Sequence, residues 1–366
     1  MKKEEDKQIP ATMYVTHIPE NVKFSEHFSS LMLSSDFMAT AMEVSALSLL
    51  TGIAWVYKIQ VEHSKTLFEV AIAMWSLSLF KRIYNNYLEA VYCTYPKNRT
   101  QPVKEHALKA KKDLAGRDKE QLEILVAQDR LNFISRFCLD LFIYFMIPGF
   151  YLAEYSQPCT LVRKVLQLLL NHYFMSFSMY WFHRAQHKNP WFWKNIHSLH
   201  HWAKYPVSRT TYQDHWLDNF GMAVTGHIYA QILFPLDGHM FWFSRIVRVC
   251  ESLEKHSGIT GNFNLAYAAQ QWLPFAAMPY HHDWHHEGYK GGNFSFAALG
   301  GIWDQLFGTR RTGRVPQPLN KTFAGSKNED QVQFLDTSFF DGPYTCFIPI
   351  AAITVIVFLK VSMGHI

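Results

Sequence analysis

The residues best able to do chemistry in this chain are histidines, and most of them lie in one stretch. Thirteen of the 19 histidines fall between residues 183 and 286. They form three motifs: HRAQH with His183 and His187, HSLHH with His197, His200 and His201, and HHDWHH with His281, His282, His285 and His286. Neutral imidazole is a good ligand for iron, copper, nickel and zinc. The three motifs therefore predict a metal centre.

The spacing within each motif favours a helix. Residues three or four apart lie on one helical face, so each motif is expected to present its imidazoles on a single face. The third motif allows two frames, His281 with His285, or His282 with His285 and His286; the second frame repeats the second motif and is favoured. Eight clustered histidines exceed the roughly four ligands of one tetrahedral zinc site. Two neighbouring metal ions fit this number better.

These motifs, in this order and followed by WDQLFGT at 303–309, resemble the fatty acid hydroxylase/sterol desaturase superfamily. The resemblance covers about residues 131–310 and is closest to the sterol C4-methyl oxidase branch. It implies a membrane-bound non-haem di-iron oxidoreductase with two iron ions per chain and O2 as co-substrate. It also implies electrons from NAD(P)H through an external donor, cytochrome b5 and/or a reductase.

The substrate that the resemblance implies is a sterol or fatty-acyl-type lipid that enters from the bilayer. Its oxidation would be a hydroxylation, a methyl oxidation or a desaturation. A sterol desaturase, a sphingoid-base hydroxylase, a squalene epoxidase-like enzyme and an aldehyde-forming wax enzyme of the same superfamily remain alternatives. Neither the lipid, the oxidised carbon nor the oligomeric state follows from these motifs.

The resemblance also implies ligands between the second and third motifs. The stretch EKHSG makes His256 a predicted ligand, while His215 and His281 are possible ligands. The predicted metal set is His183, His187, His197, His200, His201, His256, His282, His285 and His286. The isolated His227 is expected to be structural and to serve as a neutral control. Metal-bound imidazoles usually donate their second N–H to an oxygen, and the nearby acidic candidates are Asp214, Asp218, Glu251, Glu254, Asp283 and Glu287.

The apolar segments predict an all-α, polytopic membrane bundle with a cytosolic helical cap that carries the di-metal site. The candidate segments are 38–57, 66–81, 131–152, 161–182, 220–250 and 344–360, and we expect about four spanning helices plus the C-terminal segment. The predicted divisions are a polar lead-in (1–35), a membrane hairpin (36–97), a charged insert (98–130), a catalytic domain (131–310), and a polar linker with a hydrophobic end (311–366). Pro190 predicts a break between the first two motifs.

Charge and composition narrow the partners. The net charge is +5 with no nucleic-acid motif, so an anionic membrane or an acidic redox protein is the expected partner rather than nucleic acid. No nucleotide-binding motif is present, which places the electron donor on another chain. Six residues near the motifs form a predicted basic docking face: Lys188, Lys194, Lys204, Lys290, Arg310 and Arg311. The five scattered cysteines predict free thiols, and the charged N-terminus lacks the apolar region of a cleavable signal peptide.

The distribution of lysine and arginine also predicts an orientation. Basic segments beside spanning helices tend to stay cytoplasmic. We therefore expect a multi-pass protein of the endoplasmic reticulum membrane with its N-terminus, the 98–130 insert and the metal site in the cytosol. The sequons at Asn98 and Asn293 should then carry no glycan.

Two other classes of protein fit the sequence less well. A zinc hydrolase is disfavoured because there is no HExxH motif and many histidines would be idle. A metal-binding or transport membrane protein would place its ligands near the bilayer midplane, whereas these motifs are flanked by Lys, Arg and Trp.

Overall fold

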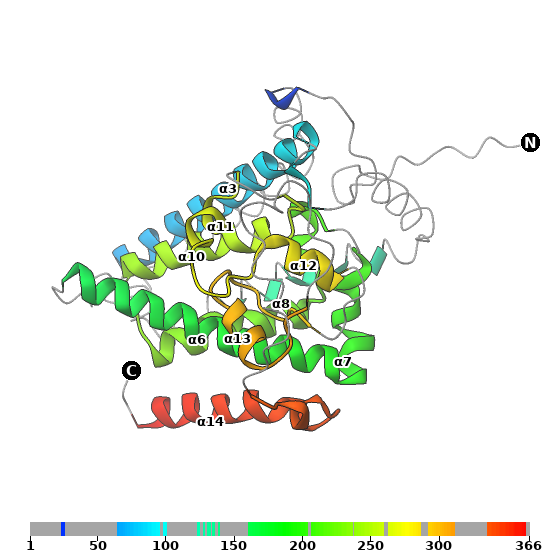
Figure 1. Ribbon diagram of the computed structural model, residues 1–366. Helices are drawn as coiled ribbons and strands as arrows, with labels where there is room; N and C mark the ends of the chain where they lie inside the picture. Colours follow the sequence, from blue (N-terminus) through cyan, green and yellow to red (C-terminus); the bar gives the residue numbers. More distant parts are fainter. Residues whose placement is uncertain are drawn as a thin grey trace, which may run out of the picture.

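The computed structural model of this chain is mainly helical over the residues that it describes (Figure 1). The residues that it describes are 23–25, 64–95, 98–100, scattered positions between 123 and 139, 160–203, 206–236, 238–259, 263–286, 292–311 and 335–363. Within these ranges there is no β-strand, and the extended pairing found is an isolated bridge between Arg99 and Ile259. The prediction of an all-α fold is confirmed for this part of the chain.

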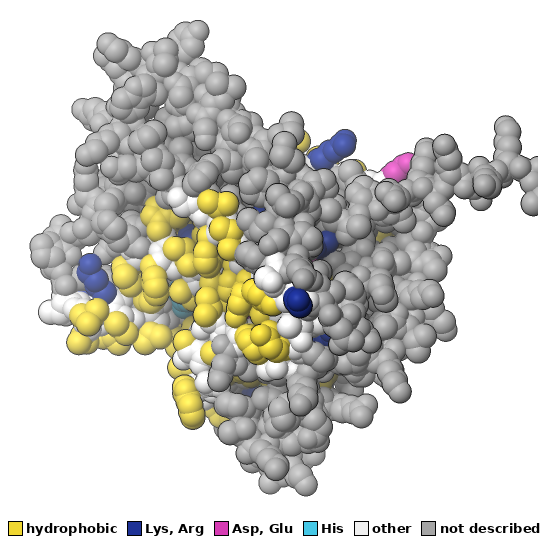
Figure 2. All heavy atoms as spheres, turned by 90° about the horizontal axis from the view of Figure 1, so that it is seen from above, with side chains coloured by type: hydrophobic (Ala, Val, Ile, Leu, Met, Phe, Trp, Pro, Cys, Tyr) yellow, Lys and Arg dark blue, Asp and Glu magenta, His cyan; other side chains and the backbone are white. Residues whose placement is uncertain are grey.

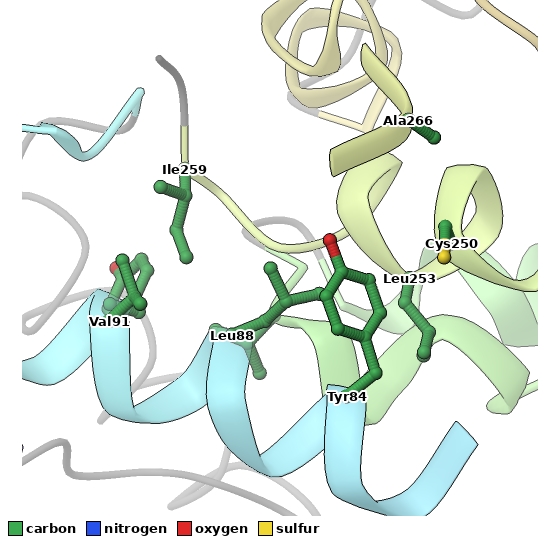
Figure 3. Close-up of a cluster of buried hydrophobic side chains, with 9 residues drawn as sticks. Tyr84, Leu88, Val91, Cys250, Leu253, Ile259 and Ala266 are labelled. Carbon is green, nitrogen blue, oxygen red and sulfur yellow. The ribbon is translucent and has the colours of Figure 1, made fainter. Parts of the chain in front are cut away.

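The first core lies between α3 (Ser64–Thr94) and α10 (Gly238–Lys255). Leu88 and Val91 of α3 meet Leu253 of α10 and Ile259 just beyond it, all at most 1% exposed (Figure 3). The predicted apolar segment 66–81 is thus part of a longer helix, whose second half is buried against α10.

A buried carboxylate on α10 connects this core to a third helix, α11 (Leu265–Gln270). Glu254 accepts a hydrogen bond from the Tyr84 hydroxyl (2.5 Å) and from the backbone N–H groups of Ala266 and Tyr267 (2.8 Å each). Two separate helices, α3 and α11, therefore hold the end of α10, two residues before His256.

The helix α6 (Leu161–Lys188) has two different halves. Its N-terminal half exposes apolar side chains, with Leu161 77% and Val162 68% exposed, whereas its C-terminal half is buried and carries the first histidine motif. Asn189 ends α6, and its side chain caps α7 (Pro190–Asn195) by accepting from the Phe192 N–H at 3.0 Å. The break predicted at Pro190 is present, so the first and second motifs lie on different helices.

A π-helix lies in the segment that packs across α6. α8 (Trp216–Met222) continues into the π-helix η6 (Ala223–Ile228) and then α9 (Tyr229–Leu233). Gly226 allows η6 to approach Met179 of α6 closely, and the Ser178 hydroxyl donates to the Thr225 carbonyl. Short π-helical turns occur often at functional sites. The break predicted within the apolar pair 220–250 is present, between Leu233 at the end of α9 and Gly238 at the start of α10.

The C-terminal helix α14 (Ile348–Ser362) lies along α6 and α9 (Figure 1). The stretch Thr345–Ser362 is the described part of the chain that is long and apolar enough to cross a membrane, and only 17% of it is buried. The candidate span 38–57 lies outside the described residues, and so does most of 131–152. The number of spanning helices and the cytosolic cap therefore stay predictions.

The apolar surface continues on another side of the molecule. Seen from above, the side chains of the described residues form a mainly hydrophobic patch with a few lysines and arginines around it (Figure 2). Exposed apolar groups of this kind, together with those of α6 and α14, are typical of a surface that meets lipid or another protein.

Four cysteines lie in the described part of the chain, Cys93, Cys138, Cys250 and Cys346, and all are free thiols. This agrees with the prediction from their scattered positions.

The close packing around Gly301 gives a test of the fold. α13 (Gly301–Leu306) begins where a Cβ on Gly301 would overlap the backbone of Phe275 and Ala277. Because backbone yields less easily than a side-chain tip, Gly301→Ala should destabilise the protein by about 1–3 kcal/mol. Thermal unfolding of the detergent-purified chain measures this change.

The neighbouring Gly300→Ala is the matched control. A Cβ there would meet its nearest atoms, which include Ser176, at 3.1–3.3 Å, so its effect should be smaller. Equal melting temperatures for Gly301→Ala and the unsubstituted chain would contradict this packing.

Candidate metal centre

Nine buried or half-buried histidines converge in two adjacent groups. The five-histidine group is His183, His187, His197, His201 and His285, and the four-histidine group is His200, His256, His282 and His286. Within each group the nitrogens that could act as ligands lie within 4.8 Å of one another. The groups adjoin, since the ring centroids of His201 and His286 are 4.5 Å apart. The structure thus brings together all nine residues that the sequence predicted as ligands.

The groups do not follow the motifs, and here the expectation of one face per motif is wrong. The second motif forms a 3-10 helix, η4 (His197–Trp202), which sends His197 and His201 to the five-histidine group and His200 to the other. The third motif, on α12 (Pro279–His286), sends His282 and His286 to the four-histidine group and His285 to the five-histidine group. In both motifs the i, i+4 pair shares a group and the remaining histidine crosses to the other, which makes the groups neighbours.

Backbone carbonyls fix the orientation of four rings. The Nδ1–H of His183 donates to the Phe294 carbonyl (2.7 Å) and that of His285 to the Gly292 carbonyl (2.8 Å). His256 and His286 donate in the same way to Ser252 (2.8 Å) and Ala203 (2.9 Å). Because a carbonyl can only accept, each ring must carry its proton on Nδ1. The Nε2 lone pairs are then free to bind a metal.

One strained turn supplies two of these carbonyls. Asn293 lies between Gly292 and Phe294 with φ 57°, a left-handed conformation that asparagine tolerates better than most residues. Its side-chain NH2 donates to the His281 and Arg311 carbonyls, and its Oδ1 accepts from the Arg311 N–H. The turn thereby positions His183 and His285 together. Because Asn293 is only 3% exposed, the lack of a glycan there would not report the membrane orientation.

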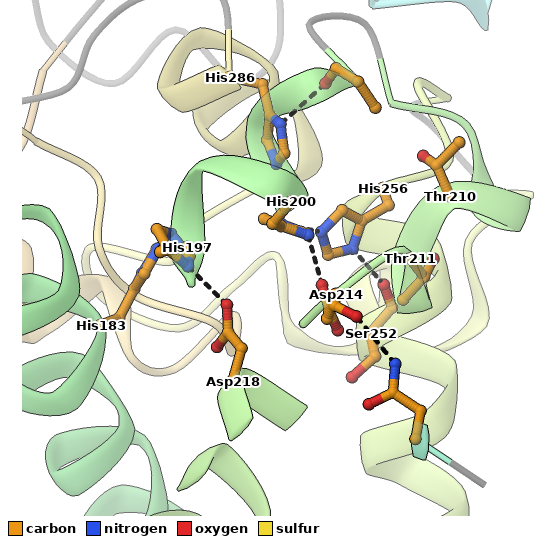
Figure 4. A network of polar contacts seen from close by, with 12 residues as sticks. His183, His197, His200, Thr210, Thr211, Asp214, Asp218, Ser252, His256 and His286 are labelled. Carbon is orange, nitrogen blue, oxygen red and sulfur yellow. Dashed lines mark hydrogen bonds and ion pairs between the residues drawn. The ribbon is translucent and has the colours of Figure 1, made fainter. Parts of the chain in front are cut away.

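Carboxylates orient two further rings, both on η4. Asp218 accepts from His197 Nδ1 at 2.7 Å, and Asp214 lies 2.6 Å from His200 Nδ1 (Figure 4). These acids were two of six candidates from the sequence. The other candidate acids that the structure describes have different partners. Glu251 pairs with Arg248, Glu254 holds α10, and Asp283 accepts from Thr100.

The charge state of the rings follows from burial and these partners. Burial lowers the pKa of His256, His282, His285 and His286 well below the ordinary value, and the neighbouring histidines lower it further. Burial also lowers the pKa of His200, but Asp214 outweighs this and raises it. Four of the rings are therefore neutral near pH 7, as metal ligands must be.

The distances between the ring nitrogens of the five-histidine group test whether a metal fits. The Nε2 atoms of His183, His187 and His197 form a triangle with sides of 3.2, 3.0 and 3.0 Å. Nitrogens about 2.1 Å from one ion lie about 3.0 Å apart at right angles and about 3.4 Å apart in a tetrahedron. The triangle therefore fits one face of a six-coordinate site better than a tetrahedral one.

Two further nitrogens support the same interpretation. The Nε2 atoms of His201 and His285 are buried in the five-histidine group and have no hydrogen-bond partner. Leaving a buried polar atom unpaired costs roughly 1–3 kcal/mol. A cation in each group would satisfy these nitrogens and remove the repulsion between facing lone pairs, so the residues present fit a pair of metal ions.

The two possible ligands lie outside both groups. His215 caps α8, its Nδ1 accepting from the Leu217 N–H at 3.2 Å. His281 accepts from the Met278 N–H at 3.0 Å, and its other nitrogen lies 3.2 Å from the Arg310 guanidinium. The frame of the third motif that uses His282, His285 and His286 is the one whose residues converge.

Comparison with known proteins agrees with this geometry. Residues 168–309 match the family model described as fatty acid hydroxylase, and this range holds all nine histidines. This part of the chain is a fatty acid hydroxylase domain. No solved structure matches the chain.

Named relatives of the hydroxylase domain fall into two classes. The very-long-chain aldehyde decarbonylase GL1-10 of Oryza sativa subsp. japonica is 30% identical over 41% of this chain and 48% of its own length. Methylsterol monooxygenase 1-3 of Arabidopsis thaliana is 27% identical over 44% of this chain and 53% of its own length. The chain thus spans about half the length of the relatives it matches.

Several residues that support the hydroxylase domain had no clear signal in the sequence. Asp304 of WDQLFGT accepts from the Phe294 and Ser295 N–H groups (2.8 and 3.0 Å) and so holds the turn beside His183. Arg184, 2% exposed, lies between the two histidines of the first motif in sequence. It bonds to Thr337 and forms an ion pair with Asp341 at 2.7 Å. The segment that contains the 3-10 helices η9 (Ser338–Asp341) and η10 (Thr345–Phe347) is thereby attached to α6.

A cavity of about 170 Å³ reaches both groups. Its wall includes His197 of the five-histidine group and His200 and His256 of the four-histidine group, and the rest comes mainly from α3, η5 (Ser208–Tyr212), α8, η6 and α10. His227 of the π-helix also lines the cavity. Its role as a neutral control stays a prediction.

The two groups predict how metal content responds to substitution. His187→Ala removes a nitrogen from the five-histidine group, and His256→Ala removes one from the four-histidine group. Each variant should purify with about one metal ion per chain instead of about two, because each group holds its own ion. Elemental analysis of the purified protein measures the ratio.

His215→Asn is the matched control, since asparagine keeps the cap of α8 and the ring lies outside both groups. Metal loss in this variant as large as in His256→Ala, or full metal content in both alanine variants, would contradict the assignment.

Proposed function

We propose that this chain oxidises an unactivated C–H bond of a lipid with O2, at two iron ions held by the two histidine groups. The single observation that carries the proposal is the cavity, because its wall contains ligand candidates from both groups. One bound molecule could therefore lie beside both ions. Iron, when bound, would supply the reduction of O2 and the removal of hydrogen from carbon, chemistry that protein side chains cannot supply.

The protein's own residues have the tasks of holding and orienting. The carbonyls of Gly292 and Phe294 and the carboxylates of Asp214 and Asp218 hold the rings so that nitrogen lone pairs face the ions. Met179, Met222 and Phe296 give the cavity apolar walls next to these rings. A lipid segment would displace water from such walls, which limits side reactions with water.

The surroundings of the site support a lipid as substrate. α6 exposes apolar residues over its N-terminal half, and its C-terminal half carries the first histidine motif. α14 is apolar and mostly unburied, and it packs against α6. A membrane at these helices would bring a lipid to the cavity without passage through water. We place the protein in a membrane of endoplasmic-reticulum type with its metal site in the cytosol, where reductases operate.

The named relatives support lipid oxidation and leave the substrate class open. Methylsterol monooxygenases and aldehyde decarbonylases are similar to this chain at comparable levels. These names make a methylsterol and a long-chain aldehyde two of the candidate substrates.

Labelled oxygen tests the reaction itself. The purified, iron-loaded chain, supplied with a lipid extract, a reductase and NADPH, should consume O2 only when all components are present. Hydroxylation places one atom of ¹⁸O₂ in the product and the other in water, whereas desaturation leaves the lipid unlabelled. Mass spectrometry of the lipids separates these outcomes.

His256→Ala provides the inactive reference because it removes a predicted ligand, and His215→Asn should turn over normally. The proposal fails if lipid oxidation continues in His256→Ala or after iron is removed by a chelator.

The electron donor is proposed to be an acidic protein, and the docking face predicted from the sequence needs correction. Arg310 is buried, at 8% exposure, and Lys188 lies 3.2 Å from Asp341. Lys204 and Lys290 lie outside the described residues. Lys194 and Arg311 remain exposed, and they are the retained members of the face.

With limiting cytochrome b5 or reductase, turnover should fall as salt rises, because the screening length shortens to about 3 Å at 1 M. Lys194→Gln should raise the KM for the donor and leave kcat unchanged at saturating donor. Arg163→Gln, an exposed cation at the other end of α6, is the control. Salt-independent turnover, or equal donor KM in both variants, would contradict the docking face.

A further inference from the structure

The cavity wall contains a cation that the metal centre does not use. Arg245 of α10 lines the cavity and is half-buried. Its guanidinium carbon lies 5.8 Å from the centre of the Phe241 ring, and it has no carboxylate partner among the described residues. Arg184, Arg209 and Arg248, in contrast, are each paired with a carboxylate.

The acids of the same wall are already engaged. Asp214 and Asp218 face His200 and His197, and Glu251 beneath the wall pairs with Arg248. Of the other two cations of the wall, Arg248 is the partner of Glu251, and Lys81 of α3 lies over the Tyr212 ring at 3.3 Å. No described acid of the cavity is left to neutralise Arg245, so this part of the cavity favours an anion.

The exposure of the wall residues shows which end of the cavity is the outer one. The wall residues at the metal end are nearly inaccessible, with His200 4%, His256 2% and Arg248 3% exposed. Arg245, Lys81 and Ser78 are half-buried and therefore mark the outer part. An incoming molecule meets Arg245 before it reaches the histidines.

The length of α10 beyond Arg245 sets the distance between the outer end of the cavity and the histidine end. Arg245, Arg248, Val249, Ser252 and His256 all line the cavity, and their spacings of three, one, three and four place them along one helical stripe. From Arg245 to the end of α10 at Lys255 is ten residues, which at 1.5 Å per residue is about 15 Å. An anionic group at Arg245 is therefore within about 15 Å of the histidine end.

We propose that Arg245 anchors a subsite for the carboxylate of an acidic lipid, whose apolar part extends along α10 toward the histidine groups. A guanidinium binds a carboxylate through two parallel hydrogen bonds. A monovalent anion suits the site better than a phosphate monoester, because one unpaired arginine beside three acids offers little excess positive charge. The identity of this ligand as a substrate rests on the proposed lipid oxidation, but its binding does not.

Binding of end-group analogues tests the subsite without turnover. The full chain is placed in nanodiscs of phosphatidylcholine, and equilibrium binding of tritiated dodecanoate, dodecanol and methyl dodecanoate is measured, with empty nanodiscs subtracted. The unsubstituted chain should bind dodecanoate about tenfold or more tightly than the two neutral analogues, as expected for hydrogen bonds to a charged group.

Arg245→Gln should remove this preference and leave the binding of dodecanol unchanged. Arg245→Lys, which keeps the charge but not the paired hydrogen bonds, should keep part of it. Arg163→Gln, an exposed cation outside the cavity, should bind as the unsubstituted chain does. Elemental analysis of each variant shows whether the metal groups remain intact.

Two results would overturn the subsite. One is equal affinity of the unsubstituted chain for dodecanoate and dodecanol, which needs no variant to fold. The other is an unchanged preference in Arg245→Gln. Because binding requires neither O2 nor a donor, loss of lipid oxidation with an intact carboxylate preference would count against the proposed function alone.

Discussion

The structure depends on one physical constraint: nine imidazoles must be held close together, and at least four of them neutral, in a buried place. His183 and His285 each commit their Nδ1 proton to a carbonyl oxygen, so two Nε2 lone pairs lie in one group, whose ligand nitrogens are all within 4.8 Å of one another. Such an arrangement is unfavourable without a cation between the rings. The surrounding helices therefore have to hold the rings against mutual repulsion until a metal binds.

The supporting structure meets this constraint from several directions. The strained turn at Asn293 aims two carbonyls at two rings of one group. Glu254 joins α3, α10 and α11 just before His256, and Arg184 attaches the C-terminal segment to α6 beside the first motif. The oxygen partners of the rings come from distant parts of the chain, so metal affinity and folding are expected to be coupled.

The sequence allowed the convergence of these nine histidines to be predicted, because three histidine clusters at close spacing are typical of a metal centre. It could not predict how these histidines divide between the two groups. The crossing of His200 and His285 to the opposite group depends on the 3-10 form of η4 and on how α12 faces it, both set by tertiary packing. Backbone carbonyl partners such as Phe294 and Gly292 carry no side-chain signal at all. The cavity role of His227 and the isolation of Arg245 likewise depend on the packing of α3, η6 and α10.

The central claim is that the chain holds two iron ions in nitrogen-rich sites with unequal numbers of histidines. Mössbauer spectroscopy of the ⁵⁷Fe-loaded protein tests this most directly. The account predicts two iron signals of equal area and different quadrupole splitting, because five imidazoles surround one ion and four the other. A single iron per chain, or one signal from an iron without histidine nitrogen, would contradict it.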